Sequence, residues 1–204
     1  MTAAADTEQD WQADWQPVID AIGRDFAEGA VTWGGDAVER GAIRRYLEPL
    51  ELDCALHTDP DVARAAGHAD VTMPATGVIA WTIPAAWTPG QVLFDSADRD
   101  AQPVHSAINN ADMALGPRTT GFFGTDIEVD FLRDVVAGER IGRRGKTLLS
   151  CTPKETAVGR GAFMTWESEI VTEELEVVGR IRIGTYAYVP RPKDAGNAGK
   201  EDGS

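Results

Sequence analysis

The stretch "DIEVDFLRDV", Asp126 to Val135, decides the fold class of this chain. In it Ile127, Val129 and Phe131 alternate with acidic residues, and a period of two is typical of a strand with one buried face. Three more stretches rich in β-branched and aromatic residues follow, separated by short turn sequences: "GKTLLSCT" (145–152), "GAFMTWESEIVT" (161–172) and "VVGRIRIGTYAYV" (177–189). The C-terminal half therefore predicts an antiparallel meander.

The N-terminal half shows helical periodicity instead. Apolar residues over 11–26 recur every three or four positions, which predicts an amphipathic helix interrupted early by Pro17. A second helix is expected over 38–50. A short third helix is expected over about 60–66, because Asp59 is a good N-cap and a proline follows at the first helical position.

One further helix is expected inside the domain. The sequence "ATGVIAWTIPAAW", residues 75–87, is almost entirely apolar, and a helix that is apolar all round is a buried one. Residues 88–120 have little periodicity and predict a long loop. The predicted helices precede the predicted strands, and one buried helix is available for the sheet to wrap. This order indicates an α+β domain over 31–190. An N-terminal helical extension over 1–30 and a disordered polar tail over 191–204 complete the expected organisation.

Composition narrows the classes of function. The chain has 204 residues, a formal net charge of −14 and 43% hydrophobic residues, which suffices for one substantial core. Because an acidic protein repels phosphate backbones, we expect no nucleic-acid partner. No segment approaches the roughly 20 apolar residues needed to cross a bilayer, and the N-terminus has no secretory pattern. We therefore expect a soluble cytoplasmic protein with no membrane partner.

A nucleotide-binding reading of the basic stretch "GRRGKT", residues 142–147, is rejected. A phosphate-binding P-loop needs four residues between its two glycines, and Arg140 occupies the position of the first glycine. The stretch predicts a basic turn before a strand.

Cysteine and histidine give no metal or thiol site. Cys54 and Cys151 lie far apart, with no second pair to build a disulfide framework or a zinc site. Cys54 has no orienting third group for nucleophilic catalysis, so we interpret it as a small buried hydrophobe. His68 and His105 stand alone in the sequence, and we expect no metal. His68 follows the third helix, and a cation at a helix C-terminus is stabilised by the helix dipole.

Asp53 and His57 remain as candidate catalytic residues. A carboxylate and an imidazole are the minimum set for moving protons to and from water at neutral pH. Such a pair four residues apart also occurs by chance, so a surface or helix-terminal role stays open. The stretch "MPATGVIAW" then opens the buried helix, whose unpaired N–H groups can bind the oxygen of a polarised thioester. The substrate-binding candidates there are Pro74, Ala75, Thr76 and Gly77.

Three stretches together carry a resemblance to a known family. They are "RGAIRRYLEPLELDCALHTDPDVARAAGHADVTMPATG", "DIEVDFLRDVVAGERIGRRGKTLLSCTPKE" and "GAFMTWESEIVTEELEVVGRIRIGTYAY". In this order they resemble the MaoC-like dehydratases, above all the N-terminal-half type of MaoC domain, over Trp33 to Val189. The most specific part is the acidic strand followed by a Phe-Leu-Arg motif, where Asp134 replaces the usual Pro and Glu139 the usual Asp. The resemblance implies a hotdog fold, an antiparallel sheet wrapped around one long helix that begins near Ala75.

The resemblance also locates the catalytic signature, which runs Asp, any residue, Asn, Pro, an aliphatic residue and His. His57 matches the histidine and Leu56 the aliphatic residue. Leu52 occupies the position of the catalytic Asp, and Asp53 is one residue out of register. Ala55 and Cys54 replace the Pro and the Asn. This pattern implies one half of a pair, in which a different hotdog subunit supplies a complete Asp and His. A homodimer or a higher oligomer stays open as the alternative.

The implied reaction is hydration of an enoyl thioester, without a metal or redox cofactor. The phosphates of a CoA substrate need cations, and Arg143, Arg144 and Lys146 form the most basic cluster in the chain. The loop over 88–120 could shape the pocket for a bulky acyl group, such as a steroid side chain or a branched acid. Two alternatives stay open: a hotdog thioesterase, and a non-catalytic acyl-CoA-binding or scaffold subunit.

Overall fold

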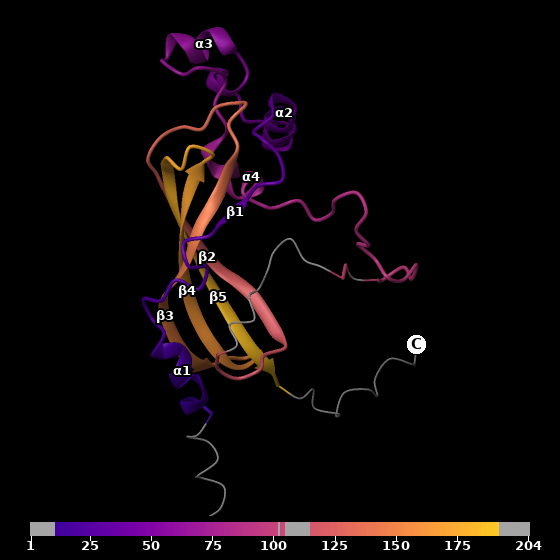
Figure 1. Ribbon diagram of the computed structural model, residues 1–204, viewed down its shortest axis with the longest axis vertical. Helices are drawn as coiled ribbons and strands as arrows, with labels where there is room; N and C mark the ends of the chain where they lie inside the picture. Colours follow the sequence, from indigo (N-terminus) through magenta and orange to yellow (C-terminus); the bar gives the residue numbers. More distant parts are fainter. Residues whose placement is uncertain (1–10, 102, 105–114, 192–204) are drawn as a thin grey trace, which may run out of the picture.

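A five-stranded antiparallel sheet forms the centre of the computed structural model, which describes residues 11–101, 103–104 and 115–191 (Figure 1). Its strands are β1 (Val31–Trp33), β2 (Gly121–Phe131), β3 (Ile141–Glu155), β4 (Gly159–Thr172) and β5 (Val177–Pro190). The strand order is β1-β3-β4-β5-β2, so β3 to β5 form a meander, with β1 and β2 at the two edges. The predicted antiparallel pairing is confirmed, but the meander comprises only β3 to β5, because β2 pairs with β5 and not with β3. β3 begins four residues earlier than predicted, at Ile141.

The two faces of the sheet differ in chemistry. Because side chains alternate along a strand, the even-numbered positions of β4 share one face, which we call the inner face. Met164, Trp166 and Ile170 lie on it and are buried. Glu167 and Glu169 point to the opposite, outer face, where each pairs with an arginine of a neighbouring strand. The inner face therefore carries the core.

Short helices cover the two ends of the inner face (Figure 1). The α-helices are α1 (Gln16–Ile19), α2 (Arg40–Leu47), α3 (Pro60–Ala65) and α4 (Val78–Trp81). The 3-10 helices are Ala13–Trp15, Glu48–Leu50, Ala55–His57 and Ala75–Gly77. At one end α2 and α4 pack with Ile141, Ile170 and Ile181. At the other end Trp15 and Val18 pack on Leu148 and Met164.

The central helix is far shorter than predicted, and this part of the prediction was wrong. In place of one long helix from Ala75, α4 ends at Trp81. A residue before proline is driven out of the α-region, so Pro84 prevents Ile83 from continuing the helix. The Ile83 carbonyl instead accepts from Gly35 N–H at 2.9 Å, and Thr82 Oγ1 donates back to the Ile79 carbonyl at 3.0 Å.

The N-terminal amphipathic helix is also shorter than predicted. Over 11–26 the helical residues are one 3-10 turn, Ala13–Trp15, and the four residues of α1. The chain then continues as turns, with Asp25 forming an isolated antiparallel bridge to Thr147 of β3. Gly23 N–H donates to the Leu148 carbonyl at 2.8 Å, and Phe26 N–H donates to the Lys146 carbonyl at 2.9 Å. Pairing with the open edge of β3 supplies these residues with hydrogen bonds that a longer helix would otherwise provide.

The remaining expectations for the loop and the termini are only partly covered by the described residues. The predicted loop over 88–120 contains no helix or strand in its described part, residues 88–101, 103–104 and 115–120. After α4 the chain runs away from the sheet (Figure 1). Of the predicted tail, only Arg191 is described, and the boundaries at residues 30 and 190 stay predictions. In the described ranges no helix is long and apolar enough for a bilayer crossing, since α2, the longest, has 8 residues.

The predicted third helix is confirmed as α3, including both of its ends. Asp59 accepts from the N–H groups of Asp61 and Val62 at 2.8 and 3.3 Å, which is N-capping. Gly67, at φ 96°, and His68 donate back to the Arg64 and Ala63 carbonyls, which closes the helix in a Schellman motif.

Removal of the Asp59 cap should destabilise the protein measurably. We expect Asp59→Ala to lower the free energy of unfolding by about 1 kcal/mol, because two N–H groups lose their acceptor. Urea denaturation would measure the change. Asp61→Ala is the matched control, since its carboxylate is exposed and caps no helix in the described structure, and it should change the free energy by about half as much or less.

Candidate functional site

His57 lies at the end of the 3-10 helix Ala55–His57 with its ring held by one residue. His57 Nδ1 is 2.9 Å from the carbonyl oxygen of Thr72 and 2.9 Å from Thr72 Oγ1. Because a carbonyl oxygen only accepts, Nδ1 carries the proton in this arrangement. Thr72 Oγ1 then donates to the Leu56 carbonyl at 3.4 Å, which satisfies every group. With the Nδ1 position occupied in this way, Nε2 is the nitrogen left to act as a general base.

Three backbone segments fix this histidine in place. Thr72 N–H donates to the Leu56 carbonyl at 2.9 Å, which ties the His57 turn to residues 71–73. Met73 N–H donates to the Val135 carbonyl at 2.7 Å, which ties residues 71–73 to the loop between β2 and β3. Thr72 is only 2% exposed, so the support for the imidazole is buried and rigid.

Two unpaired N–H groups follow Thr72 closely in the chain. Ala75 and Thr76 have no backbone or side-chain acceptor among the described residues, whereas Gly77 N–H donates to the Pro74 carbonyl at 2.9 Å. The helix that follows has a single turn, so its dipole contributes less than the predicted long helix would. The two N–H groups themselves remain available to a negatively charged oxygen.

Gly77 is required where it lies. A Cβ built on it would come within 2.4 Å of the Trp81 ring and 3.2 Å of the Tyr46 ring. The predicted substrate-binding residues Pro74 to Gly77 thus form one compact turn. Pro74 and Gly77 are buried, while Ala75 is partly exposed and Thr76 is exposed.

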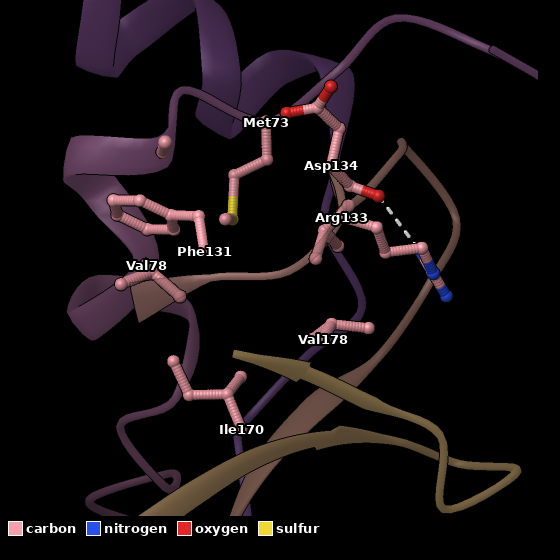
Figure 2. Close-up of a pocket in the computed structure, with 9 residues that line it drawn as sticks. Met73, Val78, Phe131, Arg133, Asp134, Ile170 and Val178 are labelled. Atoms are coloured by element: carbon pink, nitrogen blue, oxygen red, sulfur yellow. Dashed lines mark hydrogen bonds between the residues drawn. The ribbon is translucent and has the colours of Figure 1, made fainter. Parts of the chain in front are cut away.

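A small apolar pocket lies next to this turn (Figure 2). Its lining residues come from the Ala75 turn, β2, the following loop, β4 and β5: Met73, Ala75, Val78, Phe131, Arg133, Asp134, Val135, Ile170 and Val178. Figure 2 shows Met73 and Phe131 pointing into the same space, while the Arg133 guanidinium points away from it. The pocket adjoins Ala75 but is much smaller than a typical ligand pocket, and His57 does not line it.

Arg133 and Glu139 explain the most specific part of the sequence motif. Arg133 forms ion pairs with Glu139 and Glu176, each at 2.7 Å. Glu139 also accepts from Val136 N–H at 2.7 Å, which fixes the loop that carries Val135. Hydrogen bonds to both glutamates raise the pKa of Arg133. Glutamate in place of the usual aspartate thus still ties this loop together.

Asp134 forms a contact that the sequence did not predict. Its Oδ2 is 3.6 Å from His68 Nε2, at the end of α3. His68 lies just after the C-terminus of α3, as expected, and its predicted role as a cation there stays a prediction. His105, the other isolated histidine, lies outside the described residues.

No hydrogen bond or ion pair links Asp53 to His57 in the described residues. Asp53 is exposed and makes no hydrogen bond or ion pair in the described part of the chain. Leu52, at the position of the signature Asp, is 40% exposed. Among the described residues, no carboxylate contacts His57. Thr72, which sequence reasoning missed, is its partner, and no pattern in the sequence points to that residue.

The three predicted phosphate-binding cations divide between the two faces of the sheet. Arg144 lies on the outer face and donates to Glu169 at 2.6 and 2.9 Å. Arg143 and Lys146 lie on the inner face. The expectation that "GRRGKT" is a turn before a strand was wrong, because the stretch lies inside β3.

Both cysteines are free, as predicted. Cys151 lies in the core beneath α1, and burial raises the pKa of its thiol to about 11. A thiol with that pKa is a poor nucleophile at neutral pH. Cys54 is partly buried, and His57 is engaged with Thr72 instead of its sulfur.

An antiparallel sheet whose inner face wraps a short helix, with a polar turn beside that helix, defines a hotdog-fold protein. The family of FAS1-like dehydratase domain regions matches residues 21–180 of the chain. The chain therefore belongs to this dehydratase family, within the MaoC-like hotdog proteins, and the predicted family and fold class are confirmed.

A relative and two solved structures illustrate the similarity. The chain is 26% identical over 159 residues to a "Probable enoyl-CoA hydratase alpha subunit" of Thermomonospora curvata, which covers 78% of this chain and 47% of that protein. The chain thus spans about half the length of that relative. The structure of the ChsH1-ChsH2 complex from Mycobacterium tuberculosis matches with a TM-score of 0.58 at 18% identity, over 92% of this chain and 96% of that one. A MaoC-like dehydratase matches with a TM-score of 0.50 at 15% identity, over 83% and 42%.

Proposed function

We propose that this chain is one hotdog subunit of an enoyl-CoA hydratase, which adds water across the α,β double bond of an acyl thioester. The observation that carries the proposal is the orientation of His57, whose Nδ1 is engaged by Thr72 so that Nε2 is free to act as a base. The substrate arrives as a CoA thioester, and the chemistry needs no further cofactor.

The proposed reaction assigns one role to each of these polar groups. His57 Nε2 takes a proton from water as the water oxygen bonds to the β-carbon. Negative charge moves to the thioester oxygen, where the Ala75 and Thr76 N–H groups bind it. A proton then returns to the α-carbon and the 3-hydroxyacyl thioester forms. With Leu52 in the place of a carboxylate, a second group must hold or orient the water, and a partner subunit is the proposed source.

The edge of the sheet supports a partner of the same fold. Among the described residues β2 pairs only with β5, so no described strand pairs with its other edge. Phe122, Ile127 and Phe131 on this strand are 45%, 56% and 50% exposed. A second hotdog subunit that continued the sheet would cover both the apolar side chains and the open edge. The name of the ChsH1-ChsH2 structure describes a complex, which agrees with this arrangement.

A charge on the β2 edge should weaken assembly. We expect Ile127→Lys to raise the dissociation constant of the dimer at least about tenfold, because a buried interface does not accept an unpaired ammonium group. Sedimentation velocity over a concentration series would measure it. Leu175→Lys is the control, since Leu175 is similarly exposed, at 51%, but lies in the turn between β4 and β5. Equal dissociation constants for wild type and Ile127→Lys would place the interface elsewhere.

A carboxylate restored to the signature position should add activity. Leu52 is 40% exposed, so Leu52→Asp introduces a charge that stays hydrated. We expect the variant chain alone to hydrate enoyl-CoA at least about tenfold faster than the wild-type chain alone. Glu51→Asp, one residue away, is the control and should leave the rate unchanged. A Leu52→Asp chain with no gain in rate would show that the missing carboxylate does not limit activity.

The acyl group is proposed to be bulky, such as a steroid side chain or a branched acid. α4 stops at Trp81, and the described segment that follows it runs away from the sheet (Figure 1). Ile127, on the inner face of β2, is 56% exposed, which supports a site with room for a bulky group. A thioesterase would instead release free thiol, and a scaffold subunit would bind acyl-CoA without changing it, so product analysis separates the three.

A further inference from the structure

A bulge in β3 places two cations on the same face of the sheet. In the ladder between β3 and β4, Arg144 lies opposite Glu169 and Thr147 lies opposite Glu167. β3 therefore advances by three residues where β4 advances by two, which leaves one extra residue in β3. The extra residue is accommodated at Gly145, whose φ of 72° suits glycine. In a regular strand two residues three apart point to opposite faces. Here the bulge puts Arg143 and Lys146 on the same face.

The contacts of the two side chains confirm that this is the inner face. Arg143 lies opposite Ile170, an inner-face residue of the core. Lys146 Nζ lies 4.6 Å from the ring centroid of Trp166, which is also on the inner face. Between them Ser168 Oγ donates to the Gly145 carbonyl at 2.7 Å, which fixes the bulge against β4.

These two cations lack the partners that partly buried charges normally have. Buried charges are usually paired, because an unpaired one forfeits its hydration. In the part of the chain that the structure describes, neither side chain forms a hydrogen bond or ion pair, and Arg143 Nε is fully buried without an acceptor. Burial lowers the pKa of both groups, and the nearby Arg143 charge lowers that of Lys146 further. By contrast, Arg144 on the outer face is paired with Glu169.

We propose that Arg143 and Lys146 form an anion site on the inner face that binds the phosphate groups of the CoA carrier. The inference rests on the proposed function, because that function supplies the thioester. The site adjoins the thioester turn, since Ile170, opposite Arg143, also lines the apolar pocket beside Ala75. In a chain of net charge −14, a phosphate-bearing ligand needs local cations that carboxylates have not already neutralised.

Binding of CoA itself, which carries the phosphates but no reactive acyl group, tests the site without requiring catalysis. Isothermal titration calorimetry of the full chain should show Kd for CoA rising at least about tenfold in Arg143→Gln and in Lys146→Gln. Arg144→Gln removes the same charge from the outer face and is the matched control, with a change of about threefold or less. Pantetheine, which lacks all phosphates, should bind these variants and the wild type equally.

Several outcomes would overturn the site. They are absence of CoA binding by the wild-type chain, unchanged Kd in both inner-face variants, equal losses in Arg144→Gln, and parallel losses for pantetheine. Impaired folding is checked with Arg143→Met, which replaces an unpaired buried charge. We expect it to raise the midpoint of thermal unfolding by about 2–4 °C without ligand, and CoA should stabilise it less than it stabilises the wild type. A lower midpoint would show that Arg143 has a structural partner after all.

The same variants separate this inference from the proposed function. If no assembly hydrates enoyl-CoA but CoA binding depends on Arg143 and Lys146, the anion site stands and the hydratase proposal fails. If hydration is present and the KM for enoyl-CoA is unchanged in Arg143→Gln and Lys146→Gln, the hydratase proposal stands and the anion site fails.

Discussion

Substitution of His57 by Ala is expected to lower the rate of enoyl-CoA hydration by the active assembly at least about a hundredfold, the usual contribution of a general acid-base group. The reason is local: Thr72 engages Nδ1, so Nε2 is the nitrogen that we propose takes the proton from water. Alanine removes this base and leaves the backbone bonds of the turn unchanged. Loss of the conjugated enoyl thioester absorbance measures the rate.

Two controls make the His57 result interpretable. His68→Ala removes the other imidazole of the described residues, which lies 3.6 Å from Asp134 at the end of α3, and it should retain most of the activity. The unfolding midpoint of the His57→Ala chain should stay close to that of wild type, because the ring is only partly buried. A His57→Ala assembly with undiminished turnover would remove His57 from the mechanism.

A second large effect is expected from complementation. The wild-type chain alone should be dimeric or larger and should hydrate enoyl-CoA poorly, because Leu52 stands where the family places a carboxylate. Addition of a hotdog subunit with a complete Asp and His should raise turnover at least about a hundredfold, as the missing acid-base group is supplied across the junction. Titration of the partner at fixed chain concentration would give both the stoichiometry and the rate.

The complementation experiment has outcomes that would contradict the account. If the chain sedimented as a monomer at all concentrations, the proposal that it assembles into a dimer of hotdog subunits would be wrong. Full turnover by the lone chain, retained in Asp53→Ala, would show that it is self-sufficient by a route that uses neither Asp53 nor a partner. In that case the position of Leu52 would carry no functional meaning.

The strands were predictable because their pattern is local. Alternation at Ile127, Val129 and Phe131 correctly predicted a strand with these residues on one face. It did not predict their burial, since Ile127 and Phe131 are 56% and 50% exposed, whereas β3, β4 and β5 do bury side chains in the core. α3 was equally local, since Asp59 and Gly67 specify its two ends through contacts within a few residues. In these elements local preference and tertiary packing agree.

The predicted length of the central helix was wrong because the prediction gave more weight to the apolar composition of residues 75–87 than to Pro84. Residues 75–87 are apolar enough to be buried, but Pro84 ends the helix at Trp81 and sends the chain elsewhere. The family resemblance implied a long helix, and this local departure overrode it. Burial was predictable only in part, since Val78 and Trp81 are buried but Trp87 is 48% exposed. The length of the helix depended on a single backbone constraint.

The candidate site was predictable only in part, since its geometry depends on contacts distant in sequence. His57 and the turn at Ala75 follow from the motif, but Thr72 as the partner of His57 follows only from three-dimensional packing. Arg143 and Lys146 lie on the inner face and Arg144 on the outer face, and this placement of Lys146 depends on the bulge at Gly145. A one-residue bulge reverses which face each later side chain points to, and no composition argument reveals it.

Product analysis tests the central claim most directly. Enoyl-CoA would be incubated with the assembled subunits, wild type and His57→Ala in parallel, and the products identified by mass spectrometry. The account predicts a 3-hydroxyacyl-CoA, one water heavier than the substrate, formed by the wild-type assembly and suppressed at least about a hundredfold in the variant. Release of free CoA thiol, or intact enoyl-CoA with every hotdog partner supplied, would contradict it.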